Sequence, residues 1–241
     1  MKIVLKGMVQ GILFLCCFCL MAQQETETPK GLDPKEESIV KIASLTAQGE
    51  LDRLALELAV GLDNGLSVNE IKEVIVHLYA YGGFPRSIRG LQTFLDVLED
   101  RKNKGITDNW GKEASPIKDT RSKYDRGVET LEELILAKMD GPKPGYQQFS
   151  PEIDVFLKEH LFADLFERDV LTYQQRELTT ISVIASLGGL DPMLRSHLSI
   201  SMNMGLTPNE LNGFVDLIAT TAGEKKAADA RGVLKKVLEA R

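Results

Sequence analysis

The chain has 241 residues, of which 43% are hydrophobic and 27% are charged. This globular composition excludes a disordered, collagen-like, coiled-coil or multi-span membrane protein, and the length allows one large domain or two small ones. The formal net charge of −6 offers no general attraction to phosphate backbones, so we expect no nucleic-acid partner.

Residues 1–22 have the pattern of a secretory signal peptide. Lys2 and Lys6 precede an apolar run from Met8 to Ala22, which is too short for a stable membrane span. We expect cleavage after Ala22 and an exported protein, periplasmic or secreted, with no membrane association afterwards; an uncleaved N-terminal anchor is the alternative. All three cysteines lie in this segment, so the mature chain would contain no thiol.

A polar segment at 23–35 leads into a first helical repeat at 36–101, and a second helical repeat occupies 150–241. In both repeats the apolar residues recur at three- and four-residue spacing, as on one face of a helix. The connection at 102–149 is rich in loop-forming residues, and we predict one helix in it, over 124–139. No segment shows the two-residue alternation of a strand. The sequence therefore predicts an all-α helical bundle of two tandem repeats.

The two repeats are related by a shift of 140 positions. Over 54–101, 11 of 48 residues are identical after this shift. The segments 65–71 and 205–211 match best, since each has a glycine suited to end a helix, then Ser67 or Thr207 as an N-cap, then a glutamate that closes a capping box. Both halves therefore predict the same helix–turn–helix, and we interpret the chain as an internal duplication.

Short phrases in both repeats carry a family resemblance. The second repeat contains Arg176-Glu177-Leu178, then Leu194-Arg195-Ser196-His197, then Gly-Leu-Thr-x-x-Glu at 205–210. The first contains Glu-x-x-x-His-x-x-x-Tyr-x-Gly-x-Pro at 73–85. In this order the phrases resemble the carboxymuconolactone decarboxylase-like family. The resemblance implies a compact helical fold similar to alkylhydroperoxidase D, assembled as a homo-oligomer, a trimer or a hexamer.

The family resemblance implies one of two activities. One is decarboxylation of a carboxylated lactone, and the other is a thiol peroxidase relay through a Cys-x-x-Cys pair. Leu190 and Met193 stand where those cysteines would be, which disfavours the peroxidase.

Each repeat departs from the family pattern at different positions. The first has Glu57 where the family histidine belongs. The second has Gly213 opposite Glu73 and Leu217 opposite His77. Each half is therefore incomplete, which leaves either one composite site or none.

His197 and Glu177 are the candidate catalytic residues. Loss of CO2 from a vinylogous or β-keto-type acid needs a proton donor for the resulting carbanion or enolate, and an imidazole oriented by a carboxylate supplies one near neutral pH. Arg176 or Arg195 would steer the substrate carboxylate. The same pair would serve isomerisation or lactone opening, and a simple hydrogen bond between helices is the structural alternative.

Glu73, His77 and Tyr81 follow one another at four-residue intervals, so they share one helix face. They form either a second acid–base patch that binds substrate or an ordinary polar stripe. The three histidines lack metal-type spacing, so we expect no metal and no cofactor.

Two functions remain open at this stage. The first is a cofactor-independent decarboxylase, another lyase or an isomerase that acts on a small carboxylated compound such as a lactone, a sugar acid or an aromatic breakdown product. The second is a non-catalytic ligand-binding or assembly protein on the same scaffold.

Overall fold

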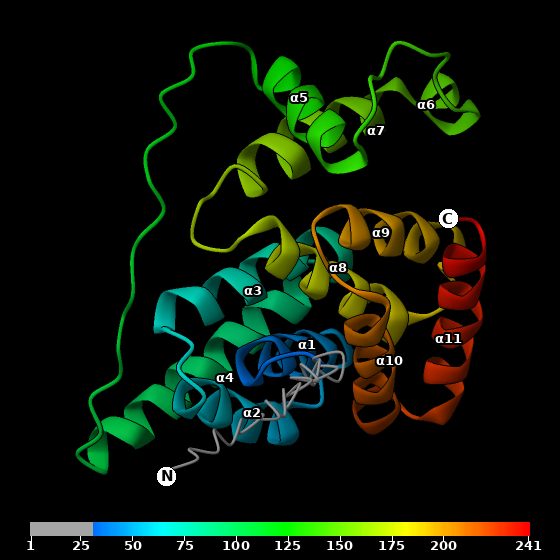
Figure 1. Ribbon diagram of the computed structural model, residues 1–241. Coiled ribbons are helices and arrows are strands. Elements are labelled where there is room, and N and C mark those ends of the chain that lie inside the picture. The colour runs from blue at the N-terminus through cyan, green and yellow to red at the C-terminus, as the bar shows by residue number, and fades with distance from the viewer. Residues whose placement is uncertain (1–30) are drawn as a thin grey trace, which may run out of the picture.

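The structure is a computed structural model that describes residues 31–241. The predicted signal peptide and its three cysteines lie outside the described residues, as does most of the 23–35 segment. All regular structure in the described part is helical, which confirms the predicted all-α fold (Figure 1). None of the described helices is long and apolar enough to cross a membrane.

Four helices form each repeat. The first repeat consists of α1 (Pro34–Gln48), α2 (Leu51–Asp63), α3 (Val68–Gly82) and α4 (Phe84–Asn103). The second consists of α8 (Tyr173–Leu187), α9 (Asp191–Asn203), α10 (Pro208–Ala222) and α11 (Glu224–Glu239). The order of the helices is the same in both sets, as the duplication predicts.

The turn before α3 and the turn before α10 are built in the same way. Ser67 and Thr207 each cap their helix in a complete capping box with the glutamate three residues later. The preceding Gly65 and Gly205 have φ angles of 92° and 104°, in the left-handed region that favours glycine. The local signals for helix ends in the two halves are therefore confirmed.

One hydrophobic core is shared by both repeats. The helices α1 and α8 pack against each other at its centre, α3 packs on α8, and α10 packs reciprocally on α1 (Figure 1). Buried side chains of both halves join the same cluster, from Ile39 on α1 to Val237 on α11. The duplicated chain thus folds as one bundle in which each half completes the other.

The connection between the repeats contains more helix than the sequence predicts. It holds α5 (Lys123–Ile135) and a short second helix, α6 (Gly145–Phe149). The predicted helix over 124–139 ends early because Leu136 adopts a left-handed conformation, with φ of 55°. Next, α7 (Pro151–Val155) and the π-helix η1 (Phe156–Leu165) lead into the second repeat.

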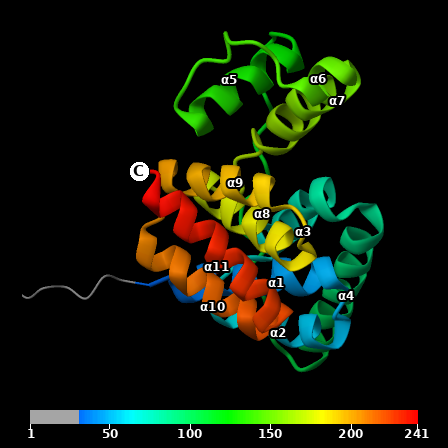
Figure 2. The same cartoon turned by 90° about the vertical axis from the view of Figure 1, so that its right-hand side faces the viewer.

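The helices α5, α6, α7 and η1 form an arm that stands beside the bundle (Figures 1 and 2). Its small apolar cluster, which includes Leu134, Phe162 and Phe166, reaches the bundle through Ile200 on α9. The four helices of the second half that correspond to α1–α4 begin at α8, and α7 and η1, which fall within the predicted second repeat at 150–241, belong to this arm.

Candidate functional site

The predicted pair His197 and Glu177 lies at the junction of α9 and α8. The His197 Nδ1 atom is 2.9 Å from the Glu177 Oε2 atom. The Glu177 side chain is fully buried and that of His197 is 13% exposed. When Glu177 is ionised it only accepts hydrogen bonds, so Nδ1 carries a proton and donates it. The other ring nitrogen, Nε2, makes no hydrogen bond within 31–241 and is not buried.

The turn between α8 and α9 sets this geometry. Gly188 and Gly189 have φ angles of 71° and 72°, which allow the chain to reverse directly after α8. Pro192 then occupies the first turn of α9, where a missing N–H costs no hydrogen bond. The two helices pack side by side, and this brings His197 opposite Glu177.

Glu73 on α3 joins two arginines in a buried ion-pair network. Its Oε1 atom is 2.9 Å from Arg176 on α8 and 2.8 Å from the Nε atom of Arg168. Arg176 is completely buried and also donates to the backbone carbonyl of Arg168. Its guanidinium is thus held inside the protein by Glu73. We predicted that Arg176 steers a substrate carboxylate. In the structure its guanidinium is buried and already paired with the carboxylate of Glu73, so this position gives no support to a contact with substrate.

His77 on α3 lies fully buried beside this network. Its Nδ1 atom is 3.2 Å from Arg176 and its Nε2 atom is 3.0 Å from the hydroxyl of Thr180 on α8. Burial, followed by the charges of Arg176 and His197, lowers the pKa of His77 well below its ordinary value. His77 is therefore a neutral imidazole at physiological pH.

Tyr81, one turn after His77, lies between the two histidines. Its ring centroid is 5.6 Å from that of His77 and 5.8 Å from that of His197. Its hydroxyl is buried without a hydrogen-bond partner. Burial and then the charge of Glu177 raise the pKa of Tyr81 far above its ordinary value, while Thr180 lowers it by a smaller amount. The phenol therefore keeps its proton at physiological pH.

Arg195 is the predicted residue that the structure does not bring to this cluster. It is exposed on α9, and its side chain makes no hydrogen bond or ion pair within residues 31–241. The predicted substrate contact of Arg195 therefore has no support in the geometry.

The remaining predicted residues form one cluster drawn from both repeats. The first repeat contributes Glu73, His77 and Tyr81, and the second contributes Glu177 and His197. The incomplete repeats left two alternatives, one composite site or none. The structure brings the residues of both repeats together in one cluster. We call it the composite site, and it includes Arg168, Arg176 and Thr180.

The equivalent place on the other side of the bundle lacks these groups. There α10 carries Gly213 and Leu217 and packs on α1, and α2 carries Glu57. The Lys41 Nζ atom lies 3.9 Å from the Glu57 carboxylate, and no histidine is present. The duplication thus keeps one composite site and has no counterpart of the His77 and His197 pair.

Arg168 and Thr180 belong to the composite site although neither is recognisable from the sequence. Arg168 belongs to the stretch between η1 and α8, and its partner Glu73 is 95 residues earlier in the chain. Thr180 has no distinguishing feature in the sequence, since Thr179 beside it is equally buried. Only the packing of α3 on α8 separates the two threonines.

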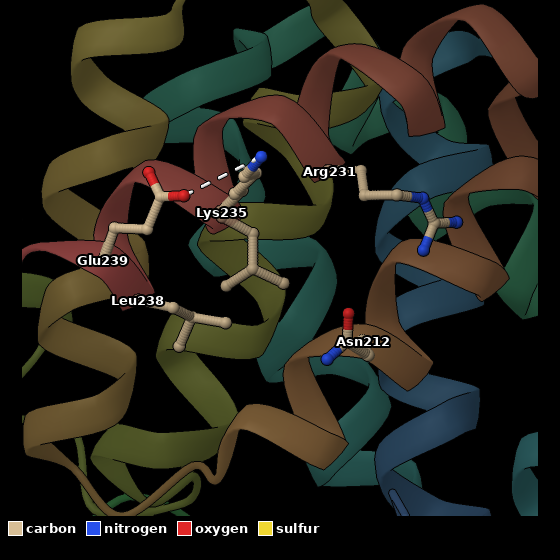
Figure 3. Close-up of a pocket in the computed structure, with 6 residues that line it drawn as sticks. Asn212, Arg231, Lys235, Leu238 and Glu239 are labelled. Carbon is tan, nitrogen blue, oxygen red and sulfur yellow. Dashed lines mark ion pairs between the residues drawn. The ribbon is translucent and has the colours of Figure 1, made fainter.

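Two surface cavities of the described residues lie away from His197. A cavity of about 350 Å³ between α10 and α11 is lined by Asn212, Arg231 and Lys235 among others (Figure 3). A groove of about 570 Å³ borders Arg168 and Tyr173. Neither includes Glu177 or His197. The His197 side chain is 13% exposed, and this exposed part is where the His197–Glu177 pair meets solvent. Within residues 31–241, no group of His, Cys, Asp and Glu side chains is arranged to hold a metal ion.

A family model described as the carboxymuconolactone decarboxylase family matches residues 17–95 and 151–236. The chain belongs to this family. One curated relative, 4-carboxymuconolactone decarboxylase of Acinetobacter baylyi (strain ATCC 33305 / BD413 / ADP1), is 36% identical over 70 residues, which cover 29% of this chain and 52% of the relative. The match thus spans about half the length of that relative.

These findings confirm the family resemblance and the tandem repeat. The two matched regions of the carboxymuconolactone decarboxylase family each contribute to the composite site. Glu73, His77 and Tyr81 lie in the first region, and Glu177 and His197 lie in the second.

Proposed function

We propose that the chain is a cofactor-independent decarboxylase that acts on a small carboxylated lactone. The observation that carries this proposal is the ion-pair geometry of His197 and Glu177. A buried carboxylate holds Nδ1–H, while Nε2 makes no hydrogen bond within the described residues and is not fully buried. This arrangement fixes the tautomer and orientation of an imidazole that exchanges protons, as in other carboxylate–histidine pairs.

The reaction needs one proton and one place for an electron pair. The bond between the carboxylate carbon and the ring breaks, CO2 leaves, and the electron pair moves into the conjugated carbonyl to form an enolate. The protonated Nε2 of His197 then gives its proton to carbon, and the enolate collapses to the product. Glu177 stabilises the imidazolium that donates, and solvent restores the proton through the exposed edge of the ring.

Family membership supports the substrate class. The curated relative is named for action on 4-carboxymuconolactone, and a carboxylated lactone has both the carboxylate and the conjugated carbonyl that the step requires. Isomerisation and lactone opening would use the same proton exchange, so both remain alternative reactions for His197 and Glu177. Export and assembly into trimers or hexamers also stay predictions.

One observation favours the second candidate, an assembly protein. The arm exposes several large apolar side chains, and Phe149 and Phe156 are 91% and 63% exposed. Such a patch is typical of a protein–protein contact surface. An enzyme that assembles into an oligomer would also have such a surface. The exposed apolar side chains of the arm are therefore consistent with both candidate functions.

The proposal is tested with purified chain and 4-carboxymuconolactone, followed by CO2 release and loss of substrate absorbance. We expect conversion by the wild type and a decrease in kcat of about 10²–10⁴-fold in His197→Gln. A matched control is His160→Gln, since His160 lies in the arm and contacts Asp164 and Tyr79. Conversion by His197→Gln at the rate of the wild type would contradict the proposal. Binding of the lactone without conversion would favour the non-catalytic alternative.

A further inference from the structure

The interior of the composite site contains unpaired polar atoms. Three buried atoms there have no hydrogen-bond partner: the Tyr81 hydroxyl, Glu177 Oε1 and Arg176 Nε. Buried polar groups are almost always paired, so such a concentration points to a functional role. The Tyr81 hydroxyl is a donor that keeps its proton, and the Glu177 oxygen is an acceptor.

The hydrogen bonds around His77 have a fixed direction. An arginine side chain has only donors, so the contact from Arg176 NH1 to His77 Nδ1 requires an unprotonated Nδ1. His77 is neutral, and its one ring proton therefore sits on Nε2. That N–H donates to the hydroxyl oxygen of Thr180, 3.0 Å away.

Tyr81 packs against the end of this chain of hydrogen bonds. Its ring centroid is 5.6 Å from that of His77, so the hydroxyl of Thr180 holds the imidazole on which the phenol ring rests. The Tyr81 hydroxyl itself has no hydrogen-bond partner among the described residues. Its proton therefore remains available for a hydrogen bond to a ligand.

We propose that Tyr81 is the hydrogen-bond donor that stabilises the enolate oxygen of the substrate, and that His77 and Thr180 position it. This inference rests on the proposed decarboxylation. As the bond to CO2 breaks, negative charge develops on the carbonyl oxygen, and the Tyr81 O–H donates a hydrogen bond to it without transferring its proton. His197, whose ring lies 5.8 Å from that of Tyr81, supplies the proton to carbon.

This placement defines the class of substrate further. The carbonyl that accepts from Tyr81 must be conjugated with the carbon that bears the carboxylate, so that the electron pair reaches its oxygen. A lactone satisfies this condition when a double bond inside its ring links the carbonyl to the carbon that bears the carboxylate. A saturated carboxylated lactone offers the same carbonyl for binding but does not lose CO2.

Tyr81→Phe tests the donor directly, because it removes only the hydroxyl. We expect kcat on 4-carboxymuconolactone to fall about 10²–10³-fold, as for removal of an oxyanion donor. We also expect weaker binding of paraconate, a saturated lactone carboxylate, by about tenfold, the effect of one hydrogen bond. Equal paraconate affinity in wild type and Tyr81→Phe, or no binding by the wild type, would overturn the inference.

The same binding measurement separates the two proposals. If the wild type binds paraconate more tightly than Tyr81→Phe but converts no lactone, the proposed decarboxylation fails, and only the hydrogen bond from Tyr81 to a lactone carbonyl stands. If conversion requires His197 and is unchanged in Tyr81→Phe, the decarboxylation stands and the donor role fails.

Thr180→Val tests the positioning role, with Thr179→Val as its matched control. Both threonines are fully buried on α8, but the Thr179 hydroxyl bonds the backbone carbonyl of Gln175. We expect Thr180→Val to lower kcat by about tenfold with KM nearly unchanged, Thr180→Ser to restore it, and Thr179→Val to leave it unchanged. Nitrogen-15 NMR should show the His77 proton on Nε2 in the wild type and a changed Nε2–H signal only in Thr180→Val. A proton on Nδ1, or equal effects of the two valine variants, would contradict the chain.

Discussion

Replacing Glu177 by Gln is expected to lower kcat about 10²–10⁴-fold while the protein stays folded. A glutamine amide oxygen can still accept from His197 Nδ1, but it removes the charge that stabilises the imidazolium. The same change also replaces a buried charged carboxylate by a neutral amide. The Oε1 atom of Glu177 has no hydrogen-bond partner, and a buried charge without full pairing destabilises a protein. We therefore expect the free energy of unfolding to stay constant or to rise, as urea denaturation would show.

This combination distinguishes a catalytic carboxylate from a structural one. A structural Glu177 would give a less stable protein and an activity loss that follows the loss of folded protein. Glu57→Gln is the control, since Glu57 also has a buried carboxylate oxygen without a hydrogen-bond partner but lies near Lys41 on the side of the bundle without histidines. Its variant should keep full activity.

Glu73→Gln is expected to destabilise the fold by about 3–5 kcal/mol, because it leaves the guanidinium of Arg176 buried without its counter-charge. Arg176 is completely buried, and Glu73 also holds Arg168. Chemical denaturation should show a lower midpoint with little change in slope.

The control for this change is an ion pair at the surface. Arg231 and Asp216 are 3.0 Å apart, and both are more than half exposed. Asp216→Asn should therefore change the free energy of unfolding by less than about 1 kcal/mol. A Glu73→Gln protein that is as stable as Asp216→Asn would show that Glu73 does not compensate the buried arginines.

The helices and their repetition could be predicted from the sequence because their signals are local. A capping box needs residues three apart, as at Ser67 and Thr207, and a left-handed glycine marks the end of the preceding helix. Such signals act within one turn of helix, so they do not depend on the rest of the fold. The helix in the connection was predicted too long because a leucine, Leu136, takes the left-handed conformation that the sequence pattern assigns to glycine.

The composite site could be predicted only in part. The contact of His197 with Glu177 joins neighbouring helices, and the family phrases named both residues. The role of Arg176 could not be predicted, because its partner Glu73 is 103 residues away in the chain. Spacing along one helix gives the face that a residue occupies, and only tertiary packing shows whether that face meets substrate or another helix.

The most direct test of a single site built from both repeats is a double-mutant cycle on kcat/KM between Tyr81→Phe in the first repeat and His197→Gln in the second. Residues that serve one reaction centre are expected to show strong non-additivity. We predict that the double variant is only slightly slower than His197→Gln alone. If the loss of kcat/KM in the double variant equals the product of the losses in the two single variants, the two residues act independently. That result would contradict the composite site.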